Sequence, residues 1–154
     1  MLLLILSGCA LFEVTHSLDE LKTLNNVNKV KVFGRDRDEQ GVWIEYQIKT
    51  IDDPQKVNAI TEAFRAYADN WQAGRYHPYL PGRLTVVFYE GETPKASIMV
   101  VSRIDRTTPS EQISYFLSQE YGSARPIHRT DFQNLVGLLD VDENMTFYDH
   151  QKNK

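Results

Sequence analysis

The sequence predicts an α+β domain in which helices pack on an antiparallel sheet of about five strands. Three observations support this fold class. Several apolar stretches alternate in character or face each other across short turns, as the strands of β-hairpins do. Two other stretches carry apolar residues at the spacing of amphipathic helices. The charged fraction of 25% and the apolar fraction of 42% are those of a globular chain and not of a disordered one.

The first hairpin is expected between residues 29 and 51. Residues 29–33 alternate as a strand does, and a charged turn bounded by two glycines follows at 34–41. Residues 42–51 form the clearest strand, because apolar residues occupy every second position from 42 to 48. The side chains expected on its apolar face are Val42, Ile44, Tyr46 and Ile48. This face should be dry and the opposite face wet.

A helix is expected from residue 54 to about residue 73. Asp53 is a favourable N-cap residue, and Pro54 suits the first helical position. The apolar stripe of this helix consists of Val57, Ile60, Phe64, Tyr67 and Trp71. We expect Ile60, Phe64 and Tyr67 to pack on the dry face of the sheet, against Ile44, Tyr46 and the central hairpin.

Three further strands and a second helix complete the domain. Residues 84–89 and 96–101 are apolar at nearly every position, which is typical of central strands that are partly covered on both faces. A fifth strand is expected at 113–121, and residues 122–129 turn back with room for one short extra strand. Thr130, with Gln133 at the capping-box position, should begin a last helix. The expected order is strand, strand, helix, three strands, helix.

The N-terminus contains Leu6-Ser7-Gly8-Cys9 after an apolar run. This resembles the lipobox of bacterial lipoproteins: an aliphatic residue, two small residues and a cysteine. The resemblance implies cleavage before Cys9, a diacylglyceryl group on its thiol and usually an acylated new amino group. Cys9 is the only cysteine in the chain; the alternative is an apolar strand or helix end that happens to contain one. Such signals begin with a basic region and no Lys or Arg precedes Cys9, so we expect the signal to begin upstream of Met1.

This resemblance divides the chain into four parts. We expect residues 1–8 to be the remnant of a removed signal peptide, 9–28 a lipid-anchored tether, 29–142 the single α+β domain and 143–154 a polar tail. Within the tether, Ser17 and Glu20 have capping-box spacing and predict a short helix near 18–24. In the lipoprotein family Asp after the cysteine retains a protein at the inner membrane. Ala10 stands there, which implies the outer membrane, facing the periplasm.

The sequence shows no catalytic or metal-binding signature. It lacks the serine-nucleophile, zinc-protease and phosphate-loop motifs. The four histidines, none four residues from another as a helical metal pair requires, are His16, His77, His128 and His150. Acidic stretches from Asp36 and from Asp140 lack the glutamate that closes a calcium loop. We therefore expect no catalytic residue, metal or cofactor, and the net charge of −4 disfavours nucleic acid as a partner.

The segment from Gly74 to Gly82 is the candidate binding site. Prolines and glycines exclude regular structure there. Aromatic residues on a proline-stiffened loop lose little entropy on binding and suit a protein contact. The candidate binding residues are Tyr76, His77 and Tyr79. In the alternative, Tyr79 and Leu80 fold back and close one end of the core.

These observations predict a lipid-anchored cell-envelope protein that acts as a protein-binding or accessory module. Its expected partners are the membrane, through acyl chains on Cys9, and another envelope protein. The alternative is a cell-wall or envelope hydrolase whose site is assembled from distant residues. A crevice with two convergent ionisable groups would favour the enzyme. A flat sheet face or a protruding loop would favour binding. A third possibility is a purely structural accessory subunit, which a large exposed apolar patch would support.

Cys9→Ser, made in a chain with its complete signal, should abolish palmitate labelling and release or stall the protein. A single acyl chain holds a protein only marginally on a membrane, so the chain without any acyl group has no anchor. Ser7→Ala keeps a small residue in the lipobox and should retain the label. Labelling that survives Cys9→Ser contradicts the lipobox assignment.

Overall fold

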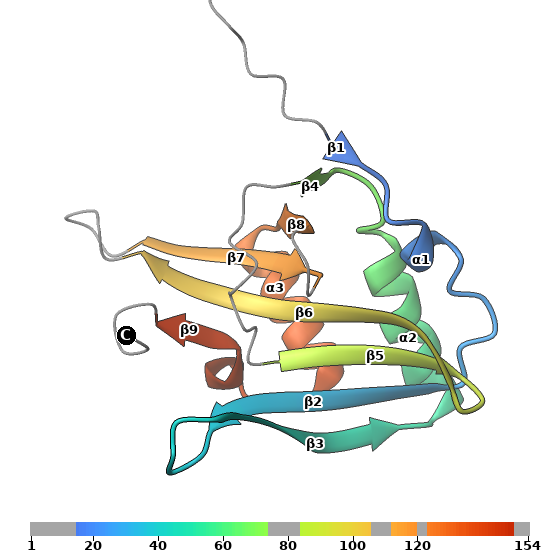
Figure 1. Ribbon diagram of the computed structural model, residues 1–154. Helices are drawn as coiled ribbons and strands as arrows, with labels where there is room; N and C mark the ends of the chain where they lie inside the picture. Colours follow the sequence, from blue (N-terminus) through green and yellow to red (C-terminus); the bar gives the residue numbers. More distant parts are fainter. Residues whose placement is uncertain (1–14, 74–83, 106–111, 120–122, 150–154) are drawn as a thin grey trace, which may run out of the picture.

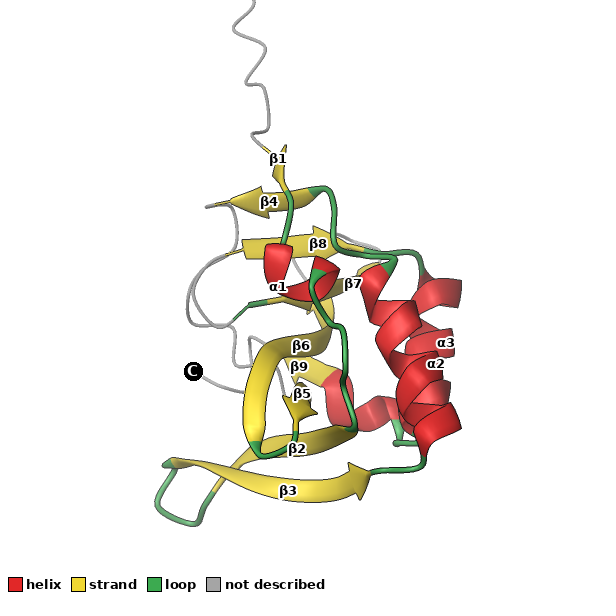
Figure 2. Ribbon diagram, turned by 90° about the vertical axis from the view of Figure 1, so that its right-hand side faces the viewer, coloured by secondary structure: helices red, strands yellow, loops and turns green. Residues whose placement is uncertain are grey.

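The computed structural model describes residues 15–73, 84–105, 112–119 and 123–149, and every statement about the fold refers to these residues. A twisted sheet carries helices α2 and α3 on one face (Figures 1 and 2). The strand order is β1-β4-β8-β7-β6-β5-β2-β3, and β9 pairs in parallel with β6. The other neighbouring strands of this order are antiparallel. The predicted α+β class is therefore confirmed.

Strands outnumber helices along the described chain. The strands are β1 (Thr15–His16), β2 (Lys29–Arg37), β3 (Trp43–Ile51), β4 (Trp71–Ala73), β5 (Leu84–Glu90), β6 (Thr93–Asp105), β7 (Gln112–Ser118), β8 (Ser123–Pro126) and β9 (Phe147–Asp149). The helices are α1 (Asp19–Lys22), α2 (Pro54–Arg65), α3 (Arg129–Leu139) and the short 3₁₀ turn η1 (Glu143–Thr146). The sheet is larger than the five strands expected. The additional strands have four residues or fewer, too short to show a period in the sequence.

The main core lies between the two helices and the central strands. Phe64 of α2 meets Phe88 of β5 edge to face, with the ring centroids 5.3 Å apart. Both side chains are fully buried, as are the apolar residues of β2, β5 and β6 that point to the helices. The predicted stripe of the last helix is also buried: Phe132, Leu135, Val136 and Leu139. Alternation and helical spacing thus identified the core correctly at these places.

The segment expected to be a tether contributes to the core from residue 15 onward. Leu18, Leu21 and Leu24 are at most 6% exposed and belong to the main core cluster. The short helix α1 lies where it was expected, but the capping box does not form. Ser17 Oγ instead donates to Asp69 Oδ1 at 2.6 Å. The described fold therefore begins by residue 15 and not at residue 29.

Helix α2 begins as predicted and ends earlier. Asp53 Oδ1 accepts a hydrogen bond from the Lys56 N–H at 2.8 Å, and Pro54 is the first helical residue. The helix ends at Arg65 instead of about residue 73, and Asn70 adopts a left-handed φ of 64°. Trp71 lies on β4, still fully buried, with its indole N–H bonded to the Tyr67 carbonyl at 2.7 Å. Burial was predicted correctly for Trp71 and its secondary structure was not.

The predicted packing of β3 under α2 is wrong. Val42, Ile44 and Tyr46 are 59%, 46% and 42% exposed. The β2–β3 hairpin extends beyond α2 and α3 (Figure 2), and Tyr46 lines a small pocket with Asn144 and Met145 of η1. A register shift between Val32 and Phe33 also interrupts the alternation. Beyond it Ile51, and not Ile44, is the buried residue of β3.

Two further expectations at the C-terminal end need correction. His128, and not Thr130, is the N-cap of α3, and it makes no side-chain capping bond. Residues 143–149, expected in a polar tail, form η1 and β9. Thr146 is fully buried and shares a 2.9 Å hydrogen bond with Ser102 of β6. In the described part of the chain, no helix has the length and apolar character needed to cross a membrane.

Phe64→Ala should lower the free energy of unfolding by about 3–5 kcal/mol, as truncation of large core aromatics does. The reason is the loss of its contact with Phe88 and the cavity that would remain. Chemical denaturation measures the change. Asn58→Ala, on the exposed face of the same helix, should change stability by about 0.5 kcal/mol or less. Equal unfolding midpoints for the Phe64 variant and the unchanged chain would contradict this packing.

Candidate functional site

The candidate lipidation and binding residues predicted from the sequence lie outside the described ranges. Cys9 precedes residue 15, and Tyr76, His77 and Tyr79 fall within 74–83. Lipidation at Cys9 and binding by this loop therefore stay predictions. The described residues offer two other features: a projecting hairpin with an apolar surface, and a pocket beside the start of α3.

The first feature is the distal half of the β2–β3 hairpin, residues 34–46, which we call the arm. It projects from the sheet beyond the helices (Figures 1 and 2). β3 is the last strand of the sheet on this side. The arm carries three of the four exposed large apolar side chains found among the described residues: Val42, Ile44 and Tyr46. We call these three residues the arm stripe.

Local interactions hold the arm in shape. At its turn, Asp38 N–H donates to the Val42 carbonyl at 2.9 Å, and the Asp38 carboxylate accepts from Val42 N–H at 2.8 Å. Gly41 has a φ of 79°, which suits glycine at this turn. The Arg37 guanidinium lies 4.9 Å from the centroid of the Trp43 ring. The acidic stretch around Asp36 and Asp38 is thus part of a hydrogen-bonded hairpin.

Gly34 explains the position of the Tyr46 ring. Gly34 is buried, and a Cβ added to it would lie 2.6 Å from Cζ of Tyr46. The absence of a side chain at residue 34 therefore lets the ring lie directly on the β2 backbone. At the base of the arm, Lys49 Nζ binds the Asp140 carboxylate at 2.9 Å. This hydrogen bond and the lysine charge hold the pKa of Asp140 below its usual value.

The outer edge of the arm offers backbone hydrogen-bonding groups. The backbone N–H and C=O of Val42 both form hydrogen bonds with Asp38, on the β2 side. Because antiparallel pairs alternate, the N–H and C=O groups of Trp43 and Glu45 point away from β2. No strand of the described ranges pairs with β3 on that side. The arm therefore combines an apolar stripe with an open strand edge, and both are features of protein-binding surfaces.

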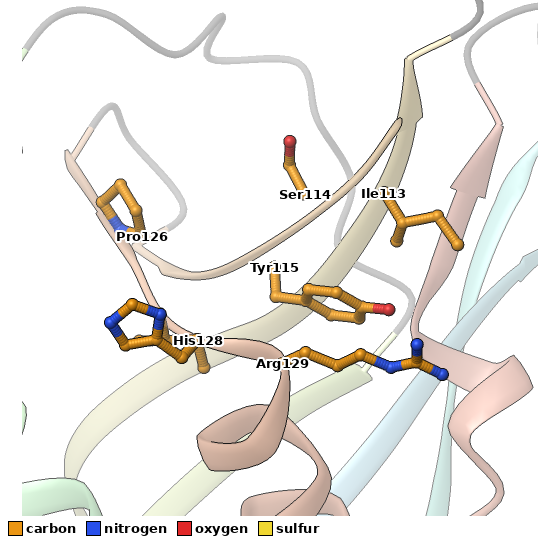
Figure 3. A pocket seen from close by; sticks show the side chains of 7 residues that line it. Ile113, Ser114, Tyr115, Pro126, His128 and Arg129 are labelled. Carbon is orange, nitrogen blue, oxygen red and sulfur yellow. The ribbon is translucent and has the colours of Figure 1, made fainter. Parts of the chain in front are cut away.

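The second feature is a pocket of about 600 Å³ between β7 and the start of α3 (Figure 3). It is lined by Ile113, Ser114, Tyr115, Pro126, Ile127, His128 and Arg129. The Tyr115 ring packs against Phe132, with the centroids 4.7 Å apart. His128 and the Arg129 guanidinium lie on opposite sides of the view in Figure 3. The two ionisable side chains therefore do not converge on one point.

One Ser–His contact resembles a catalytic pair in composition but not in geometry. Ser123 Oγ lies 3.3 Å from His16 Nε2, where β8 and β1 approach β4. A nucleophile–base pair has a separation of about 2.6–3.2 Å and a third group that orients the base. No contact to the other ring nitrogen of His16 is seen within the described ranges. The same ranges contain no group of three or more potential metal-ligating His, Cys, Asp or Glu residues.

A polar cluster joins the turn after α2, β8 and α3. The Arg125 guanidinium lies 4.9 Å from the centroid of the Tyr67 ring and donates to the Asp69 carbonyl. Burial and the neighbouring Asp131 carboxylate raise the pKa of Tyr67 above 10.0. Burial also lowers the pKa of Arg125. These contacts are structural, because they connect three elements and face no cavity found among the described residues.

The comparisons with known proteins identify no relative. No family model, curated protein or solved structure matches this chain. The lipobox resemblance and the geometry of the arm are therefore the observations that bear on function. Sequence reasoning found the residues of the arm stripe but expected them to be buried, and it missed the pocket. The long charged turn at 34–41 was the available signal that the hairpin could extend beyond the helices.

The raised pKa of Tyr67 should make the domain less stable at alkaline pH. Below pH 10.0 the phenol is protonated in both states and has no titration effect. As the pH rises from 10.0 through the folded pKa, the unfolded chain ionises first, so stability is lost. Tyr67→Phe should reduce this loss, measured by denaturation at increasing pH. Tyr89→Phe, which removes another phenol, is the control, and an equal effect of both variants would contradict the assignment.

Proposed function

We propose that this chain is a lipid-anchored protein of the bacterial cell envelope and that its folded domain binds another envelope protein through the arm. The observation that supports binding is the arm stripe: large apolar side chains left in solvent on an edge strand. Scattered single apolar residues are normal on protein surfaces, but neighbouring ones on a strand with an open edge favour association. This role agrees with the accessory or protein-binding module expected from the sequence.

Lipid anchoring is supported by the resemblance of Leu6-Ser7-Gly8-Cys9 to a lipobox. Two or three acyl chains, each with about 0.8 kcal/mol per buried methylene, would make attachment effectively permanent. Six residues, 9–14, lie between the anchor and β1 and span at most about 20 Å when extended. The domain would then stay close to the membrane surface, and its partner would be a membrane protein or a protein held near that membrane. Ala10 favours the outer membrane, facing the periplasm.

The alternative, an envelope hydrolase, has less support in the described residues. Hydrolysis needs an ionisable pair aimed at one reacting atom. The pocket beside α3 places His128 and Arg129 apart (Figure 3), and the Ser123–His16 contact has no described orienting carboxylate. The geometry therefore favours the binding role.

Site-specific photo-crosslinking in the native envelope tests this function. A photoreactive residue at position 44, in the arm stripe, should capture one defined envelope protein. The same residue at position 58, on the exposed face of α2, should not. Adding Val42→Lys should abolish capture without lowering the melting temperature by more than a few degrees, because the Val42 side chain is 59% exposed. Equal capture from positions 44 and 58, or none from position 44, would reject the arm as the binding surface.

A further inference from the structure

The pocket beside α3 lies at an interruption of the sheet. β7 pairs with β6 along its whole length, from Gln112 to Ser118. On its other side it pairs with β8 only from Phe116 to Ser118, because the chain leaves the sheet after Pro126 and enters α3. Within the described ranges, the first half of β7 therefore has a neighbouring strand on one side only.

The backbone of β7 offers hydrogen bonds in this gap. The last bond from the β8 side runs from the Ile127 N–H to the Tyr115 carbonyl at 3.0 Å. The backbone groups of Tyr115 therefore point toward the gap, and by alternation those of Ile113 do as well. The N–H of Tyr115 and both groups of Ile113 have no backbone partner on this side among the described residues. An extended segment could continue the ladder where β8 ends.

The side chains around the gap suit an apolar residue. Ile113 is 42% exposed and is the only large exposed apolar side chain of the described residues outside the arm. The Tyr115 ring is held against Phe132, so this wall of the pocket is fixed before any ligand binds. Pro126 and Ile127 add apolar surface from the other side. A partner side chain could therefore be buried here with little rearrangement.

The charge of the pocket is positive. Arg129 is exposed, and Figure 3 shows its side chain extending in the same direction as the Tyr115 ring. No Asp or Glu is among the seven residues that line the pocket. The nearest acidic residue along α3, Asp131, interacts with Tyr67 instead. In a chain with net charge −4, this is a local site for a carboxylate, which arginine binds by two parallel hydrogen bonds.

We propose that the pocket between β7 and α3 binds an extended peptide segment that carries a carboxylate. The segment continues the ladder after Ile127, which lies opposite Tyr115, and pairs with the backbone of Ile113. One apolar side chain of the segment packs on Ile113, and the carboxylate binds Arg129. The carboxylate is supplied either by an acidic side chain or by a C-terminus. This site is separate from the arm, so it does not depend on the function proposed for the arm.

Binding of fluorescent peptides to the full chain tests the site by anisotropy. The probe is a peptide of alternating valine and threonine with a free C-terminus. Its matched forms carry a C-terminal amide, or an internal glutamate together with the amide. At least one carboxylate form should bind, the neutral amide should bind about 10-fold more weakly or worse, and the form that binds identifies the source of the carboxylate. Backbone amide signals of Ile113 and Tyr115 should shift on binding.

Arg129→Gln should weaken binding of the carboxylate form about 10-fold or more. Ile113→Thr should weaken binding of the carboxylate form and of the neutral amide by a similar factor. Lys95→Gln removes the same charge at the β5–β6 turn and is the matched control; melting temperatures of all variants show that the fold is kept. The proposal is overturned if no peptide binds, if amide and carboxylate bind equally, or if Arg129→Gln has no effect. If inorganic phosphate displaces the peptide with an affinity equal to that of the peptide, the pocket is a general anion site. That result would also overturn the proposal.

Discussion

The contact of Phe64 with Phe88 determines which part of the sheet is covered. It seats α2 on the central strands, and α3 packs beside α2 on the same face. α2 and α3 cross the strands, and the β2–β3 hairpin extends along the strand direction beyond the two helices (Figures 1 and 2). The arm is exposed because α2 packs on β5 and α3 packs on β7, away from the distal part of the hairpin. The apolar stripe at 42–46 is therefore a consequence of where the aromatic core is centred.

The sequence predicted the elements that have a clear period or cap. Asp53 and Pro54 began α2 as expected, and the nearly continuous apolar runs of β5 and β6 were correctly predicted to be central strands. The alternation of a strand does not show which element packs against its apolar face. Ile44 was therefore predicted to lie in the core, although the core does not extend to it. Trp71 fits the spacing of the α2 stripe, although α2 ends at Arg65 and Asn70 has a left-handed φ. The spacing of apolar residues therefore predicted which side chains are buried better than it predicted where the helix ends.

The candidate sites were less predictable for the same physical reason. The pocket beside α3 depends on where β8 leaves β7, which is set by tertiary contacts and not by any local motif. Its residues come from β7, β8 and α3, and none of them carries a recognisable signature alone. The arm depends on Gly34, which permits the Tyr46 ring to lie on β2, and a single glycine in a charged stretch indicates only a turn. The resemblance to a lipobox could be seen in the sequence because the four residues that carry it are contiguous.

The two proposed surfaces share one physical origin: strand edges that the chain itself does not pair within the described ranges. They differ in chemistry. The arm presents apolar side chains at the end of the sheet, whereas the β7 gap presents backbone groups beside a single positive charge. An apolar edge gives affinity through burial, and a charged gap selects one orientation of a bound strand. The proposed lipid anchor would hold the domain within about 20 Å of a membrane and would raise the local concentration of partners there, which favours association through short surfaces of this kind.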